Sequence, residues 1–124
     1  MDKKLKNEAE TKAQIIMNYY QSKSYDLAIA NAKKLLKKFP NYVFLFNIIG
    51  LSLQSKKKFN EAINYFHKAL QINPNYFLAL NNIGLSYRLM GNDEEAQIYF
   101  EKAIERNPKF ATAFSNLANI KKDL

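Results

Sequence analysis

Three prolines, Pro40, Pro74 and Pro108, recur at a spacing of 34 residues in this chain of 124 residues. The sequence around them repeats as well, because AINYFHKALQINPNYFLALNNIGLSY (62–87) is followed by AQIYFEKAIERNPKFATAFSNLANI (96–120). A constant period of this length is typical of one supersecondary unit that stacks on copies of itself. The chain is therefore expected to form a single repeat domain over residues 1–124.

Each unit has the pattern of two helices. Apolar residues fall at helical spacing in residues 43–56 and again in 60–72, and the segment KKKFN separates the two runs. Pro74 ends the second helix, because it has no N–H to donate and disfavours the α conformation at Asn73. Three Gly and three Pro in the whole chain are too few turn formers for a many-stranded β fold. The pattern predicts an all-α chain.

The repeated residues resemble the tetratricopeptide repeat. In the third unit this resemblance is carried by Leu80, Ile83, Gly84, Tyr87, Ala96, Phe100, Ala103 and Pro108, and in the second by Phe46, Ile49, Gly50, Ala62, Phe66, Ala69 and Pro74. The first unit keeps Tyr19, Ala28 and Pro40, but it has Lys12 in place of the aromatic residue and Ile16 in place of Gly. Atypical terminal repeats are expected in a solenoid, because one face has no neighbouring repeat.

The resemblance implies a right-handed α-solenoid of stacked antiparallel helix pairs with seven helices. Its units are an atypical repeat 1 at about 9–42, repeat 2 at 43–76, repeat 3 at 77–110 and a terminal helix at 111–124. The terminal helix has two interpretations: it shields the third repeat, or it begins the next unit of a longer array.

The helical angle of each residue separates two faces of the first helix in each unit. Leu80, Ile83 and Gly84 share the face that packs, and the resemblance places the opposite face in a concave groove. We predict that this groove contacts a peptide through nine residues: Asn47, Ile48, Leu51, Leu78, Asn81, Asn82, Leu85, Asn116 and Asn119. Amides match a peptide backbone, and the apolar residues suit an extended segment or the apolar face of a helix.

Relatives that bind acidic chaperone tails hold the two carboxylates with Lys, Arg and Asn on the concave face. In this chain the resemblance places five residues at the clamp positions, and none of them is a cation: Ala13, Met17, Ile48, Leu78 and Asn82. We therefore expect no dicarboxylate clamp and no chaperone tail as the partner.

The net charge of +8 lies in residues 1–68, mainly in the lysine clusters at 33–39 and 56–58, on outer helices and turns. Lys33, Lys34, Lys37 and Lys38 are interpreted as solvated partners of a helix dipole in preference to an anion site. Binding of nucleic acid or other anions is ranked lower, because only two Arg are present and no aromatic platform for single strands is recognisable.

No catalytic or metal-binding motif is found in the sequence. The chain has no Cys and one histidine, His67, which is predicted to be a surface residue on an outer helix. We expect no cofactor, no metal and no enzymatic activity. The charged N-terminus is unlike a signal peptide, and the most apolar stretch is too short to span a bilayer. The expected location is the cytoplasm, without membrane partners.

These observations predict a non-catalytic module for protein–protein interaction that binds a peptide segment or helix in its groove. An alternative is an N-terminal module that recruits substrates or partners for a larger enzyme, such as a transferase. Self-association through the apolar groove is a further alternative.

Overall fold

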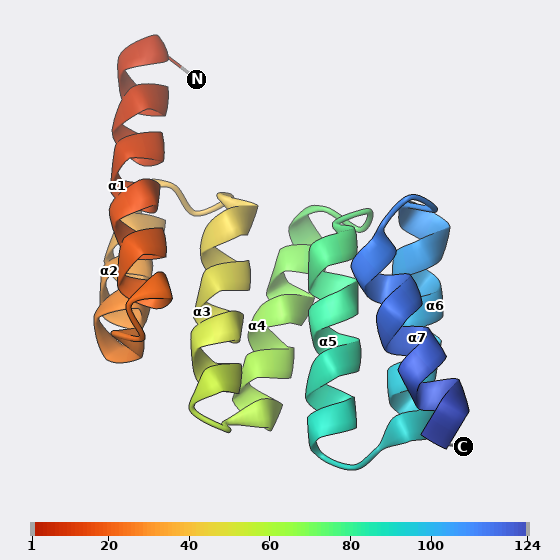
Figure 1. The fold of residues 1–124 in the computed structure, drawn as a ribbon. Helices are drawn as coiled ribbons and strands as arrows, with labels where there is room; N and C mark the ends of the chain where they lie inside the picture. Colours follow the sequence, from red (N-terminus) through yellow and green to blue (C-terminus); the bar gives the residue numbers. More distant parts are fainter. Residues whose placement is uncertain (1, 124) are drawn as a thin grey trace.

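The computed structural model describes residues 2–123, and these form seven α-helices with no strand. This confirms the all-α fold class (Figure 1). The helices are α1 (Lys3–Gln21), α2 (Tyr25–Lys38), α3 (Val43–Ser55), α4 (Phe59–Ile72), α5 (Phe77–Leu89), α6 (Asp93–Arg106) and α7 (Ala111–Asp123). No helix within the described range is long and apolar enough to cross a bilayer.

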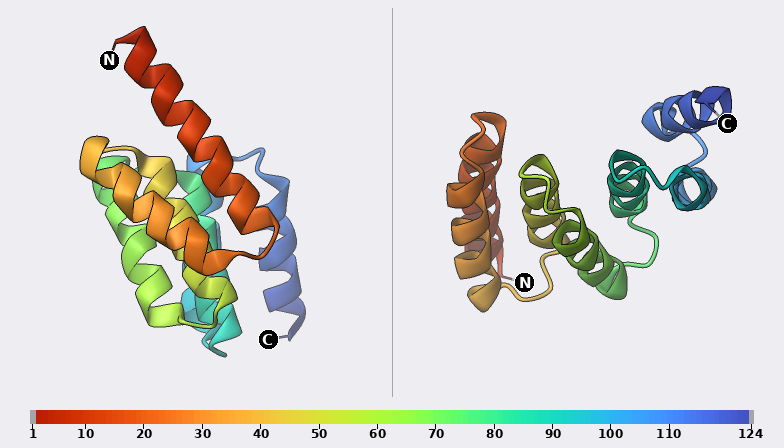
Figure 2. Two further views of the ribbon diagram at one scale, coloured as in Figure 1. Left: turned by 90° about the vertical axis from the view of Figure 1, so that its left-hand side faces the viewer. Right: turned by 90° about the horizontal axis from the view of Figure 1, so that it is seen from below.

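Consecutive helices pack in pairs, α1 with α2, α3 with α4 and α5 with α6, and α7 packs against α6. Each second helix also packs against the first helix of the next unit, as α2 does on α3. The pairs therefore follow one another along an arc, which is visible in the right-hand view of Figure 2. Helices α1, α3 and α5 contact each other in succession, and we call them and α7 the inner helices. The others are the outer helices.

Small residues let the helices of a pair approach closely. A Cβ atom on Gly84 would lie 2.7 Å from Cδ1 of Phe100, and a Cβ on Gly50 would likewise overlap the ring of Phe66. Both rings are fully buried. In the first repeat the sizes are exchanged, because Ile16 occupies the glycine position and Ala32 the phenylalanine position. Both residues are buried in the same core cluster. The atypical repeat therefore fills its core with a large side chain on the first helix and a small one on the second, the reverse of the other repeats.

Each outer helix ends two residues before a proline, at Lys38, Ile72 and Arg106. This is the boundary that the prolines predicted. At the start of α6, the side chain of Asn92 accepts a hydrogen bond of 3.4 Å from the backbone N–H of Glu95. Residue types at these ends therefore fix the helix lengths.

The first helix is longer than the repeat pattern indicated. Helix α1 begins at Lys3, six residues before the expected start of repeat 1 near residue 9. Asp2 caps it by accepting a hydrogen bond of 2.9 Å from the backbone N–H of Lys4. The added turns extend past the ends of the other helices (Figure 1). The repeat pattern could not show them, because the side chains of residues 3–7 are exposed and follow no core spacing.

Candidate peptide-binding groove

Six of the nine residues predicted to contact a peptide are at least partly accessible. They lie on three inner helices: Leu51 on α3, Leu78, Asn82 and Leu85 on α5, and Asn116 and Asn119 on α7. Leu78 is 38% exposed, and the side chains of Asn82 and Leu85 are half-buried. We call these six residues the groove strip. It carries amide and hydrocarbon groups and no charged side chain.

Two predicted contact residues, Asn47 and Asn81, are buried and serve the stacking of repeats. Asn82 Nδ2 donates a hydrogen bond of 3.0 Å to Oδ1 of Asn47. Asn116 Nδ2 donates an equivalent bond of 3.1 Å to Oδ1 of Asn81. The two acceptor residues are only 6% and 5% exposed. Their amides therefore hold neighbouring inner helices together and lie beneath the accessible surface.

Ile48 was also predicted to contact a peptide, but its side chain is only 1% exposed and belongs to the core. It lies in the same apolar cluster as Leu45 and Ile49. Helix α3 contacts the inner helices on both of its sides, α1 and α5. A bound chain therefore cannot reach Ile48 unless the side chains that bury it move.

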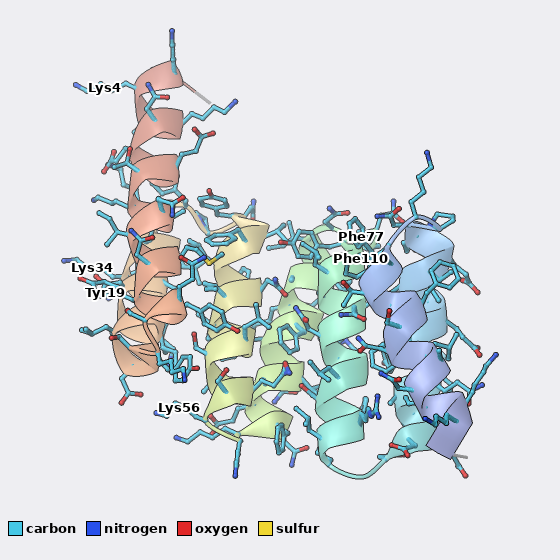
Figure 3. The ribbon with its side chains drawn as sticks, viewed as in Figure 1. Lys4, Tyr19, Lys34, Lys56, Phe77 and Phe110 are labelled. Carbon is cyan, nitrogen blue, oxygen red and sulfur yellow. The ribbon has the colours of Figure 1, made fainter. Side chains whose placement is uncertain are left out.

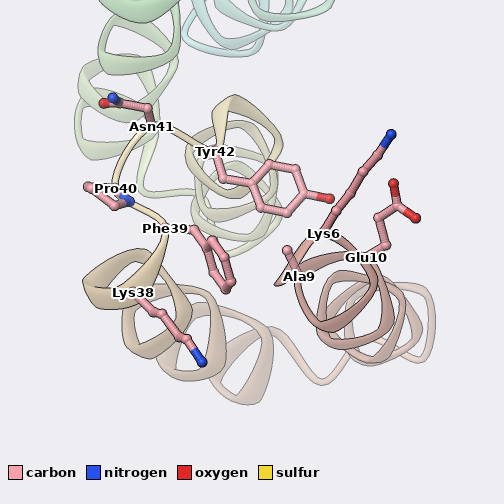
Figure 4. A pocket seen from close by; sticks show the side chains of 8 residues that line it. All are labelled: Lys6, Ala9, Glu10, Lys38, Phe39, Pro40, Asn41 and Tyr42. Carbon is pink, nitrogen blue, oxygen red and sulfur yellow. The ribbon is translucent and has the colours of Figure 1, made fainter. Parts of the chain in front are cut away.

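The N-terminal end of the groove is hollowed between α1 and α3. A pocket of about 290 Å³ there is lined by Glu10, Ala13, Gln14, Met17, Tyr42 and Phe44. A second pocket, of about 690 Å³, shares Glu10 and Tyr42 with it and extends towards Phe39 and Pro40 (Figure 4). Burial raises the pKa of the Tyr42 hydroxyl, and the Glu10 carboxylate adds to this effect. The hydroxyl therefore stays protonated at neutral pH and can donate a hydrogen bond.

A small side chain accounts for this second pocket. At the third repeat, Phe110 packs edge-on against Phe77 with ring centroids 4.9 Å apart, as the labelled pair in Figure 3 shows. The same two repeat positions hold Tyr42 and Ala9 at the first repeat. Ala9 contributes a methyl group where Phe77 contributes a ring, and it lines the second pocket. Tyr42 was missed from the sequence because it lies in the loop before α3, although an aromatic residue two positions after each proline was a usable signal.

The lone histidine lies on outer helix α4, as predicted, but its ring is half-buried rather than free on the surface. It packs edge-on against Tyr99 with ring centroids 6.1 Å apart. Burial lowers the pKa of His67, and the nearby charge of Lys102 lowers it further. Among the side chains of residues 2–122, no cluster of three or more His, Cys, Asp or Glu residues could bind a metal ion.

Solved structures with the same fold show how general this architecture is. The first TPR of Spaghetti (RPAP3) bound to the HSP90 peptide SRMEEVD is 23% identical, with a TM-score of 0.84 over 93% of this chain and 91% of that one. The first TPR domain of human RPAP3 is 24% identical, with a TM-score of 0.86 over 92% and 90%. The Yersinia enterocolitica type III secretion translocator chaperone SycD is 18% identical, with a TM-score of 0.87 over 94% of each chain. Among curated proteins, no sequence relative was found.

Stacked antiparallel helix pairs define this chain as a helical-repeat domain of the α-solenoid class. The tetratricopeptide repeat model matches residues 43–109, which is more than half of the chain and covers the second and third repeats. The chain belongs to the tetratricopeptide repeat family.

Proposed function

We propose that this chain is a non-catalytic protein-interaction module that holds a peptide segment or a helix of a partner along the groove strip. Solenoid proteins commonly use the concave surface that their curvature creates for binding. The observation that carries the proposal is the groove strip itself. Leu78, Leu85 and Asn82 remain accessible on the inner side, although the core positions of the same helix are buried.

The chemistry of the strip favours a ligand of low charge. Each asparagine amide has two N–H donors and one oxygen, and the bond to Asn47 uses one N–H of Asn82. Apolar groups beside the amides supply most of the binding free energy when they leave water, and the amides fix the register of the bound backbone. A bound segment is expected to bring one or two large apolar side chains to Leu51, Leu78 and Leu85.

An acidic chaperone tail fits this groove poorly. One structural neighbour is bound to the acidic HSP90 peptide SRMEEVD. In this chain the clamp positions are Ala13 and Ile48, which are buried, Met17 and Leu78, which are apolar, and Asn82. Carboxylates that lose water here would meet no cation among these five residues, so their desolvation would be uncompensated.

A peptide selection with matched variants tests the proposal. Random 12-residue peptides displayed on phage are selected on the whole chain, and the affinities of the enriched peptides are measured by fluorescence anisotropy. Leu85→Glu is expected to weaken binding at least about tenfold, because a buried carboxylate would oppose an apolar ligand. Ile98→Glu makes the same kind of change at an exposed residue of outer helix α6 and should leave affinity unchanged.

Equal affinity for both variants would place the binding site elsewhere. Selected peptides that are consistently acidic and depend on Leu85 would contradict the preference for a ligand of low charge. Far-UV circular dichroism and a cooperative melt establish that each variant is folded.

A further inference from the structure

The first repeat has an open side at the N-terminal end of the stack, away from α3. Helices α1 and α2 lie side by side there and face the viewer in the left-hand view of Figure 2. A groove of about 740 Å³ runs between them, lined by Lys12, Ile15, Ile16, Tyr19, Asn31, Lys34, Leu35, Lys37 and Lys38. We call this surface the end face. Tyr19 and Lys34 mark it at the outer edge of the stack in Figure 3.

The repeat position of Ile15, Ile49 and Ile83 shows that the end face lacks a covering helix. Ile49 on α3 and Ile83 on α5 are fully buried, at 0% exposure. Each lies on a helix that packs against the outer helix of the preceding unit, α2 or α4. The same position on α1 is Ile15, which is 47% exposed. The end face therefore presents the surface on which a helix packs elsewhere in this molecule, and the described residues place no helix on it.

The charge around this apolar surface is strongly positive. Four lysines and no carboxylate line the groove. Glu8, at its edge, pairs with Lys38 at 2.8 Å and with Lys12 at 3.2 Å. Lys34 and Lys37 have no carboxylate partner among the side chains of residues 2–122. A ligand that carries acidic residues would find these two ammonium groups available.

We propose that the end face docks an acidic amphipathic helix of a partner protein, which covers Ile15 with its apolar stripe and pairs its carboxylates with Lys34 and Lys37. The apolar contact supplies affinity, and the charges select the partner and its orientation. This site is separate from the groove strip, so one chain can hold two ligands at once.

Two other occupants fit the end face less well. Nucleic acid would meet the lysines but has no apolar stripe to cover Ile15, and the face offers no arginine. A second copy of this chain that offered its last helix would bring Lys121 and Lys122, which lie in the last turn of α7, to a face that already carries four lysines. Like charges would therefore meet across such a contact.

A library of helix-forming peptides tests this proposal on the whole chain. Twenty-residue peptides with apolar residues at heptad positions a and d, and all other positions randomised, are displayed on phage and selected. Enriched peptides are expected to carry a net negative charge. Their affinity should fall at least about tenfold for Lys34→Glu/Lys37→Glu and for Ile15→Glu, and it should weaken with added salt. Ile15→Ser is the second variant if Ile15→Glu does not fold.

The repeat supplies a matched control. Lys68 and Lys102 occupy the position of Lys34 in the second and third repeats and are exposed, so Lys68→Glu/Lys102→Glu makes the same change in net charge away from the end face. The control should retain affinity. An equal loss in the control, the absence of acidic peptides from the enriched set, or unchanged binding of acidic peptides to Lys34→Glu/Lys37→Glu would each overturn the proposal.

The end face and the groove strip are distinguished by one further variant. Leu85→Glu should leave the affinity of these helices unchanged; loss with Leu85→Glu but not with Ile15→Glu would assign the helices to the groove and overturn the end-face site alone. A 20-nucleotide oligo(dT) serves as the second probe. If it binds through Lys34 and Lys37 with no effect of Ile15→Glu, and no acidic helix is selected, the surface binds nucleic acid and the proposal is wrong.

Discussion

The side-chain amide of Asn82 donates a hydrogen bond of 3.0 Å to Oδ1 of Asn47, which belongs to the preceding repeat. The same bond recurs one repeat later between Asn116 and Asn81. Each bond joins two inner helices beneath the groove strip. Residues that were predicted to contact a ligand therefore also set the distance between neighbouring repeats.

Replacing Asn82 with Ala should destabilise the fold. The substitution leaves the oxygen of Asn47 buried without its partner, which costs about 1–3 kcal/mol. Urea unfolding followed by circular dichroism measures the change in the free energy of unfolding. Asn119→Ala, on the exposed side of α7, should change it by less than about 0.5 kcal/mol. Equal effects of the two variants would show that the Asn47–Asn82 bond adds no stability.

Gly84→Ala should also be destabilising, although Ala is the better helix former. The new Cβ would lie 2.7 Å from the fully buried Phe100 ring and 3.2 Å from the backbone oxygen of Ala96. Overpacking of this kind costs about 1–3 kcal/mol, against a gain in helix propensity of about 1 kcal/mol.

Thermal melts measure this change, with Ser55→Ala at an exposed site of α3 as the control that gains propensity alone. Combining Gly84→Ala with Phe100→Leu should cost less than the two losses added together, because the shorter side chain makes room. Strict additivity would argue against the overlap.

His67 should make the fold less stable as the pH falls below about 6.5, the ordinary pKa of a histidine side chain. Its pKa is lowered in the folded state, first by burial and then by Lys102, so the folded chain binds its proton less readily than the unfolded chain. The stabilising contribution is therefore complete above the unfolded pKa of about 6.5 and is lost as the pH falls through the lower folded value.

The melting temperature of the wild type is expected to fall on acidification from pH 7.5 to 5.5, and that of His67→Gln to fall less. A titration of the imidazole protons by NMR should give a midpoint below about 6.5. Parallel pH curves for the two proteins would contradict this prediction.

Deleting residues 2–6 should have little effect on stability. These residues form the added turn of α1 and its cap, and their side chains are exposed. We expect a loss below about 1 kcal/mol, mainly from the cap of Asp2. Ile16→Ala, in the core of the same helix, should cost about 2–5 kcal/mol in the same urea titration. A deletion as costly as Ile16→Ala would mean that the projecting turn packs against the fold.

The family and the pairing of helices could be read from the sequence, because they rest on local rules. Prolines end the outer helices at Lys38, Ile72 and Arg106, and glycines lie beneath Phe66 and Phe100 in the second and third repeats. Such signals recur with the repeat and need no knowledge of distant contacts. The place of the groove strip on α5 also follows from helical angles, since Leu78 and Leu85 lie opposite the core face of that helix.

Sequence alone determined which face of each inner helix is committed to its own pair, since a helix turns by a fixed angle at each residue. Only the tertiary structure decided how closely neighbouring pairs approach, and hence that Ile48 is buried while Leu78 is accessible. It also decided that the side chain of Ile15 is exposed, whereas Ile49 and Ile83 at the same repeat position are buried. Burial depends on what packs from other repeats, and no local pattern in one helix contains that information.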